Sequence, residues 1–190
     1  IFIVDDNIVG SGMKYIRRAK DLFDRLEGSG KEWGAQTCLN IVEHDDLMRS
    51  ASRSGCKALL IGFESLDPET LESMHKPVNL RPATRNFSDA IKKIHDQGIA
   101  IIGCFIFGTD TQDKDVFKRT VDFVLENKID AVQMTLSTPL PGTALYRQMV
   151  AEKRLLLTDY PNDWSHYNIV EPVFQMKNMT PQEAYQGLLK

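Results

Sequence analysis

The sequence predicts an α/β protein built as a partial β/α barrel, and three observations support this fold class. Short apolar runs of strand length alternate along the chain with longer segments whose apolar residues recur at helical spacing. The helical segments are long enough to connect parallel strands by right-handed crossovers. Five such units follow one another without a sign of reversal, which favours strands of a barrel; a doubly wound open sheet is the alternative.

Boundaries of the expected elements come from apolar patterning together with caps and breakers. Helix 13–26 stops before the Gly28-Ser29-Gly30 breaker, and helix 45–54 ends at Gly55, a residue favoured after helix C-termini. We expect strands at 1–4, 33–41, 58–63, 99–107 and 131–136, and helices at 13–26, 45–54, 67–75, 84–97, 113–126 and 143–151.

The last part of the chain reads differently from the repeating units. After Lys153 the pattern becomes irregular, and Thr180 then opens a final helix as a capping box with proline in its first turn. We therefore divide the chain into an incomplete barrel core at 1–152 and an irregular extension at 153–190 that ends in a helix. In helix 113–126 the residues expected to face inward are Val116, Phe117, Val121, Val124 and Leu125.

Composition excludes several classes of protein. The chain has 190 residues, of which 42% are hydrophobic and 26% charged, so it can bury a sizeable core. Its net charge is −3 and no basic stripe is present, which does not favour nucleic-acid binding. No apolar run reaches the roughly 18 residues of a membrane helix. The three cysteines are scattered without a C-x-x-C pair, which indicates a reduced, cytoplasmic protein.

Polar residues collect where the predicted strands end, which is where α/β proteins place their chemistry. Asp5-Asp6-Asn7 follows the first strand and could bind a substrate ammonium group or a divalent cation; a solvated turn that caps the next helix is the alternative. Glu64-Ser65 follows the third strand, and a carboxylate can accept both hydroxyls of a ribose. The alternative for Glu64 is a surface ion pair with lysine.

The fourth predicted strand contains one glycine and is followed by another. Gly103 lies within the strand and Gly108 at its end. An interior glycine weakens a strand unless something approaches the backbone closely. A flat adenine ring is one candidate for that close approach, and tight packing of a helix is the other. The four histidines are too scattered to predict a zinc site.

Taken in order, these strings resemble one family, the radical S-adenosylmethionine (SAM) enzymes that carry an N-terminal cobalamin-binding domain. The resemblance covers the chain to about Pro181, and within the family the chain resembles the anaerobic magnesium-protoporphyrin monomethyl ester cyclases and related methyltransferase-like members. The strings that carry it are Phe2-Ile3-Val4-Asp5-Asp6-Asn7, Ser54-Gly55-Cys56, Ile61-Gly62-Phe63-Glu64-Ser65, the segment 71–76, Gly98-Ile99, Phe105-Ile106-Phe107-Gly108 and Thr138-Pro139-Leu140-Pro141-Gly142-Thr143.

The resemblance implies a partial barrel and a set of cofactors. In such enzymes a 4Fe–4S cluster, bound by C-x3-C-x2-C after the first strand, chelates SAM and cleaves it to a 5′-deoxyadenosyl radical. Cobalamin is a second cofactor of the class, and an electron donor such as flavodoxin or ferredoxin supplies the electron. This chain lacks the cysteine triplet. We therefore expect the triplet and the first strand upstream of Ile1, so that the chain comprises strands two to six and is inactive alone.

The resemblance also implies roles for individual residues. Asp5, Asp6 and Asn7 occupy the motif that meets the methionyl amino group of SAM. Glu64 and Ser65 occupy the ribose-facing position. The adenine position falls on Gly103 and 106–108, which include Ile106 and Gly108, and the interior of the barrel would be lined by Gln133 and Thr135 from the last strand.

Two other functions remain open from the sequence. A non-redox β/α-barrel lyase would need a lysine or a cluster of histidine and aspartate at the strand ends, and no predicted strand ends in lysine. A catalytically inactive barrel that serves as a binding module is the other possibility. In each case the partner is a small organic molecule, without nucleic acid or a membrane span.

Overall fold

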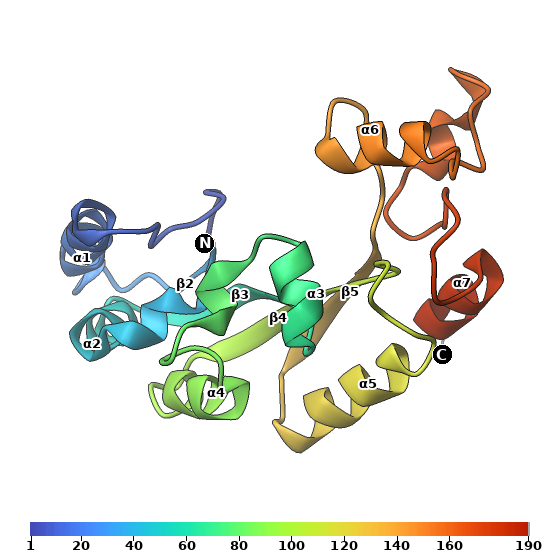
Figure 1. Cartoon of the computed structure of the whole chain (residues 1–190). Helices are drawn as coiled ribbons and strands as arrows, with labels where there is room; N and C mark the ends of the chain where they lie inside the picture. The colour runs from blue at the N-terminus through green and yellow to red at the C-terminus, as the bar shows by residue number, and fades with distance from the viewer. Residues whose placement is uncertain (190) are drawn as a thin grey trace. The chain divides into compact units, whose positions relative to one another are not determined.

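The computed structural model describes residues 1–189 and contains the predicted alternation of strands and helices (Figure 1). The strands are β1 (Phe2–Ile3), β2 (Trp33–Thr37), β3 (Cys56–Glu64), β4 (Ala100–Phe107) and β5 (Ala131–Leu136). The α-helices are α1 (Met13–Leu26), α2 (Asp45–Arg53), α3 (Pro68–Ser73), α4 (Phe87–His95), α5 (Val116–Glu126), α6 (Ala144–Ala151) and α7 (Pro181–Leu189). Short 3-10 helices occupy Leu39–Glu43, Pro77–Leu80 and Asn162–His166.

The five strands form one sheet in the order β1-β2-β3-β4-β5. β1 pairs with β2 in parallel, with Phe2 opposite Gly34, and β2 pairs with β3 in parallel, with Ala35 opposite Leu59. The α/β class and the parallel sheet are therefore confirmed. Since the strand order follows the chain without reversing, the sheet is compatible with part of a barrel and lacks the switch point of a doubly wound sheet.

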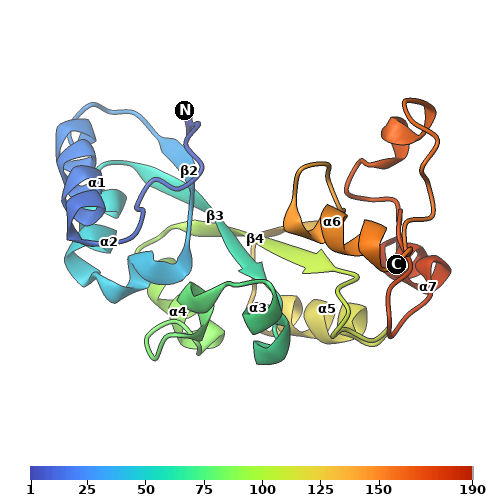
Figure 2. The ribbon, with the colours of Figure 1, turned by 45° about the horizontal axis from the view of Figure 1, so that its top comes forward.

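Alternation along β3 explains which side of the strand packs against helices. Leu59, Ile61 and Phe63 are at most 1% exposed, whereas Leu60 and Gly62 between them are only half-buried. The Phe63 ring meets the Phe87 ring of α4 edge-on at 5.2 Å, so α4 covers this side of the strand (Figures 1 and 2). One side of β3 is thus packed against a helix, and its other side keeps half-buried residues.

Contacts divide the chain into two compact units, which we describe separately. The first unit comprises Ile1–Phe63, Leu71–Cys104 and Phe123–Gln133, and the second comprises Glu64–Thr70, Phe105–Asp122 and Met134–Lys190. Strand β4 contributes residues to both units. No helix among residues 1–189 is both long and apolar enough to cross a bilayer.

Two details of the sequence prediction are wrong. The strand expected at 33–41 ends at Thr37, and Leu39–Glu43 forms a 3-10 helix with buried Leu39 and Ile41. Apolar patterning cannot distinguish a short buried turn from the end of a buried strand. In α5, Val121 and Leu125 are not inward but 42% and 70% exposed. The apolar stripe of this helix is wider than the face that the protein buries.

The C-terminal part of the second unit is held by backbone pairing and by the predicted helix cap. Leu155 and Phe174 form an isolated antiparallel bridge, flanked by a bond from the Leu156 N–H to the Val173 carbonyl at 2.9 Å. The Glu183 N–H donates to Thr180 Oγ1 at 3.1 Å, and the Thr180 N–H donates to the Glu183 carboxylate at 2.9 Å. The capping box at the start of α7 is therefore confirmed.

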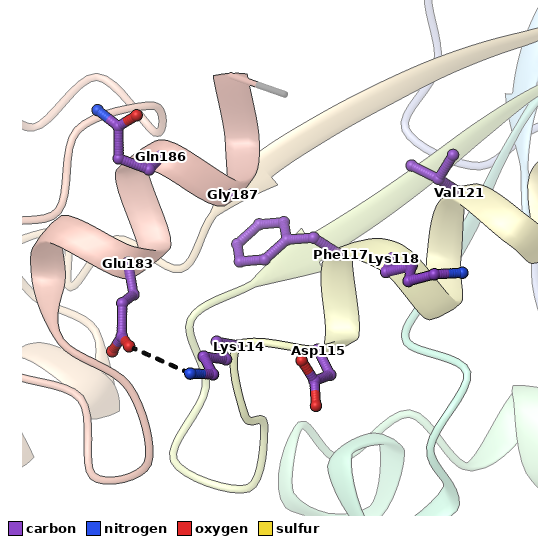
Figure 3. Close-up of a pocket in the computed structure, with 8 residues that line it drawn as sticks. All are labelled: Lys114, Asp115, Phe117, Lys118, Val121, Glu183, Gln186 and Gly187. Carbon is purple, nitrogen blue, oxygen red and sulfur yellow. Dashed lines mark ion pairs between the residues drawn. The ribbon is translucent and has the colours of Figure 1, made fainter.

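We expect Gly187→Ala to destabilise the second unit by about 1–3 kcal/mol, the usual cost of overpacking a core. Figure 3 shows Gly187 on α7 beside the Phe117 ring, and both residues line a pocket of about 420 Å³. An added Cβ would overlap that ring, with Cγ only 2.7 Å away. Alanine normally favours a helix by about 1 kcal/mol over glycine, so a measured stabilisation in urea unfolding would contradict the packing. The exposed Gln186→Ala is the control and should change stability by less than about 0.5 kcal/mol.

Candidate functional site

Glu64 ends β3 in an unusual backbone conformation. Its φ is +64°, in the left-handed region that residues with a side chain rarely adopt. Buried and half-buried residues alternate along β3, and Glu64 is one of the half-buried residues. Such conformations cost free energy and cluster at functional sites, so this one supports a role for the carboxylate.

The backbone just before Glu64 is held by Asn79. This side chain is 1% exposed, and its Nδ2 donates to the carbonyls of Gly62 at 3.0 Å and Phe63 at 2.8 Å. Asn79 thereby satisfies strand carbonyls at the point where β3 turns away. A single asparagine in a loop carries no distinguishing pattern, so the sequence does not predict this residue.

A buried polar network joins the ends of β3 and β4 within the second unit. Ser65 is 3% exposed and Gln112 is 1% exposed. Gln112 Nε2 donates to the Ile106 carbonyl at 3.1 Å and lies 3.5 Å from Ser65 Oγ, while the Thr109 N–H donates to Gln112 Oε1 at 3.2 Å. The predicted residues Ser65 and Ile106 are therefore brought together, through a glutamine that the sequence analysis did not single out.

Gly108 directly follows β4 with a φ of +81°. This left-handed backbone favours glycine. A Cβ there would lie 2.9 Å from the Met176 Cε, the mobile end of a flexible side chain, so the backbone conformation rather than space explains the residue. Ile106 belongs to the half-buried alternation of β4. Gly103 belongs to the buried alternation, together with Ile101.

An ion pair between Asp110 and Arg154 holds the loop that follows β4. Arg154 Nη1 lies 2.8 Å from Asp110 Oδ2, and Nη2 bonds to the other carboxylate oxygen, while Nε donates to the Gln175 carbonyl at 2.7 Å. The Arg154 side chain is only 12% exposed. Hydrogen bonding from Arg154 lowers the pKa of Asp110 below its usual value. The loop is thus fixed between Gln112 on one side and Arg154 on the other.

In the first unit, Asn7 organises the loop after β1. Its Oδ1 accepts from the Gly10 N–H at 3.2 Å and from the Cys38 N–H at 3.4 Å, and its Nδ2 donates to Cys38 Sγ at 3.2 Å. Asn40, 2% exposed, donates to the Gly10 carbonyl at 2.6 Å. Asn7 therefore pins this loop to the end of β2.

The acidic residues before Asn7 are more open. Asp5 and Asp6 are both exposed, and Asp5 lies 3.5 Å from the Arg18 guanidinium. On the last strand, Gln133 is exposed and Thr135 is half-buried, with its hydroxyl 3.5 Å from the Phe105 carbonyl. These four side chains are accessible to a ligand.

The described residues do not fit an iron–sulfur cluster. Cys38 follows the end of β2, whereas Cys56 starts β3 opposite Trp33, at the other end of the same strand pair. Burial raises the pKa of Cys56 to about 12, which disfavours the thiolate that a metal requires. Among residues 1–189, no three histidine, cysteine or acidic side chains could hold a metal ion together.

Comparison with known proteins identifies relatives along almost the whole chain. The bacteriochlorophyllide d C-12(1)-methyltransferase of Chlorobaculum tepidum is 32% identical over 176 residues, which cover 91% of this chain and 37% of the relative. The anaerobic magnesium-protoporphyrin IX monomethyl ester cyclase of Cereibacter sphaeroides is 21% identical over 188 residues, covering 98% of this chain and 29% of the relative. No protein-family model matches.

Among solved structures, the radical SAM methyltransferase TsrM from Kitasatospora setae, with cobalamin and a [4Fe-4S] cluster bound, has the same fold. The TM-score is 0.63 at 13% identity, over 90% of this chain and 35% of that one. The chain is thus similar in sequence to the methyltransferase and the cyclase described above, and it has the fold of a radical SAM methyltransferase. It spans about a third of the length of the two curated relatives described above. The resemblance predicted from the strand-end motifs is confirmed.

Proposed function

We propose that this chain is the SAM-binding part of a radical SAM enzyme that transfers a methyl group to a large, flat organic substrate. The observation that carries the proposal is Glu64, held in a left-handed conformation beside buried Ser65 at the end of β3. The activity of the 32% identical relative, methylation of bacteriochlorophyllide d, supports methyl transfer and a tetrapyrrole-like substrate. A lyase or an inactive binding module has no comparable support.

In this proposal each strand end has one task toward SAM. The carboxylate of Glu64 accepts the ribose hydroxyls, and Ser65 binds beside it. Asp5, Asp6 and Asn7 meet the methionyl amino group, where the exposed carboxylates supply the opposite charge. The adenine ring is assigned to the β4 positions Gly103, Ile106 and Gly108, and Gln133 and Thr135 face the substrate.

The cofactors belong to the same proposal. The described residues hold no cluster, so a 4Fe–4S cluster would be bound by residues outside this chain. Cobalamin is the second proposed cofactor, and flavodoxin or ferredoxin the proposed electron donor. The contribution of this chain is to bind and orient SAM and to keep water from it.

A second candidate activity is oxidative cyclisation of a magnesium-protoporphyrin ester. It is favoured by the cyclase relative, whose similarity extends over 98% of the chain. The identity of 21% is lower than that of the methyltransferase, which makes methyl transfer the first choice.

The two activities are separated by following the methyl group of SAM. The complete gene product, reconstituted without oxygen with iron, sulfide and cobalamin, would be incubated with methyl-labelled SAM and either a bacteriochlorophyllide or the magnesium-protoporphyrin ester. Methyl transfer predicts label in the tetrapyrrole. An unlabelled product with a new ring would favour cyclisation, and no change in either tetrapyrrole would contradict both substrate assignments.

A further inference from the structure

The carboxamide of Gln112 has only one orientation that satisfies its neighbours. The Thr109 N–H must donate to an oxygen, and Gln112 Oε1 lies 3.2 Å from it. The Ile106 carbonyl must accept from a nitrogen, and Gln112 Nε2 lies 3.1 Å from it. A flipped amide would face oxygen with oxygen and N–H with N–H. Because the side chain is 1% exposed, water cannot compensate for such a flip.

This orientation determines what the Ser65 hydroxyl can do. Two donors approach Ser65 Oγ, the Asp67 N–H at 3.1 Å and Gln112 Nε2 at 3.5 Å. Neither group can accept a hydrogen bond, so the hydroxyl oxygen accepts from both and its proton must point elsewhere. Within residues 1–189 the structure gives that proton no acceptor.

We infer that Gln112 is a positioning residue that makes the Ser65 hydroxyl an obligate donor to an oxygen of the bound ligand. The inference rests on the proposed function and deepens it, since the ligand oxygen is then a ribose hydroxyl of SAM. Ser65 follows Glu64 directly in the chain. A vicinal diol can use both residues, because each of its hydroxyls can accept a hydrogen bond from Ser65 and donate one to Glu64.

A double-mutant cycle on SAM binding tests whether Gln112 acts through Ser65. The dissociation constant would be measured by calorimetry on the complete, anaerobically reconstituted gene product and its Gln112→Met, Ser65→Ala and doubly substituted variants. Each single change should weaken binding about tenfold, the scale of one hydrogen bond in a buried site. The double variant should bind no more weakly than Ser65→Ala alone, because Gln112 is inferred to act only through the Ser65 hydroxyl, which alanine already removes.

A second substitution protects the test from a loss of folding. Gln112→Glu keeps the volume and the oxygen that serves the Thr109 N–H. Burial favours its neutral form, but once it is ionised at raised pH, its second oxygen accepts the Ser65 proton and draws it from the ligand. SAM binding by this variant should therefore weaken as the pH is raised, by up to as much as in Ser65→Ala. The control is Thr120→Val in α5, a buried polar position 2% exposed, which should leave the SAM dissociation constant unchanged whatever it does to the melting temperature.

The possible outcomes separate this inference from the proposed function. The role of Gln112 would be overturned if the fold-losses of SAM affinity in the two single variants multiplied in the double variant. It would also be overturned if Gln112→Glu bound SAM as tightly as the wild type at every pH. Either result would leave the SAM site itself intact. A wild-type protein that carries its cluster and binds no SAM would overturn the proposed function and the inference together. Equal losses in the single and double variants would support both.

Discussion

Replacing Glu64 by glutamine is expected to weaken SAM binding by about 1–3 kcal/mol, the scale of a buried hydrogen bond to a charged group. A carboxylate accepts from two ribose hydroxyls at once, whereas glutamine has one acceptor oxygen and turns a donor toward the other hydroxyl. The loss corresponds to a rise of about five- to 150-fold in the dissociation constant. Calorimetric titration of the complete gene product with SAM measures it directly.

A matched control separates this effect from a general loss of charge. Glu69 is an exposed glutamate in the first turn of α3, and Glu69→Gln should leave SAM binding unchanged. If Glu64→Gln bound SAM as tightly as the wild type, the assignment of Glu64 to the ribose would be wrong. The left-handed backbone at Glu64 would then need another explanation.

Replacing Arg154 by methionine is expected to lower the free energy of unfolding by about 2–3 kcal/mol at pH 7. Breaking a fully buried pair costs about 3–5 kcal/mol, and an exposed pair contributes at most about 1 kcal/mol. This pair lies between those limits, with Arg154 12% and Asp110 25% exposed. Methionine keeps the apolar stem against Phe174 but leaves the Asp110 carboxylate without its bidentate partner. Urea unfolding of the wild type and the variant measures the difference.

The pH dependence of that difference follows from the lowered pKa of Asp110. The pKa is lowered in the folded state relative to about 3.9 in the unfolded chain, so the stabilisation is complete above that value. It is lost as the pH falls through the folded pKa. The stability gap between the wild type and Arg154→Met should therefore shrink below about pH 4. The exposed Arg17→Met should show no gap. A loss of unfolding free energy below about 1 kcal/mol in Arg154→Met at pH 7 would refute a stabilising role for the Arg154–Asp110 ion pair.

Most of the fold could be predicted because it depends on patterns that are local in sequence. Apolar runs, caps and breakers locate all five strands and the helices between them. The errors fall where burial decides the outcome. The residues Leu39 and Ile41 are as apolar as a strand but pack as a 3-10 helix, and Leu125 is apolar but faces solvent.

The candidate site could be predicted only at the strand ends. Glu64 and Ser65 were found because they follow an apolar strand, but the residues that orient them lie far away in the sequence. Gln112 reaches Ser65 across 47 residues, and Asn79 reaches the Phe63 carbonyl across 16. A single sequence contains no periodicity that reports such contacts, so they appear only once the chain is folded.

Electron paramagnetic resonance of the complete, reduced gene product, with and without SAM, tests the central claim most directly. If this chain binds SAM for a radical enzyme, the protein carries a 4Fe–4S signal that changes when SAM is added, and Glu64→Gln needs more SAM for the same change. A protein that reconstitutes no cluster, or a cluster signal that saturating SAM leaves unaltered, would contradict the account.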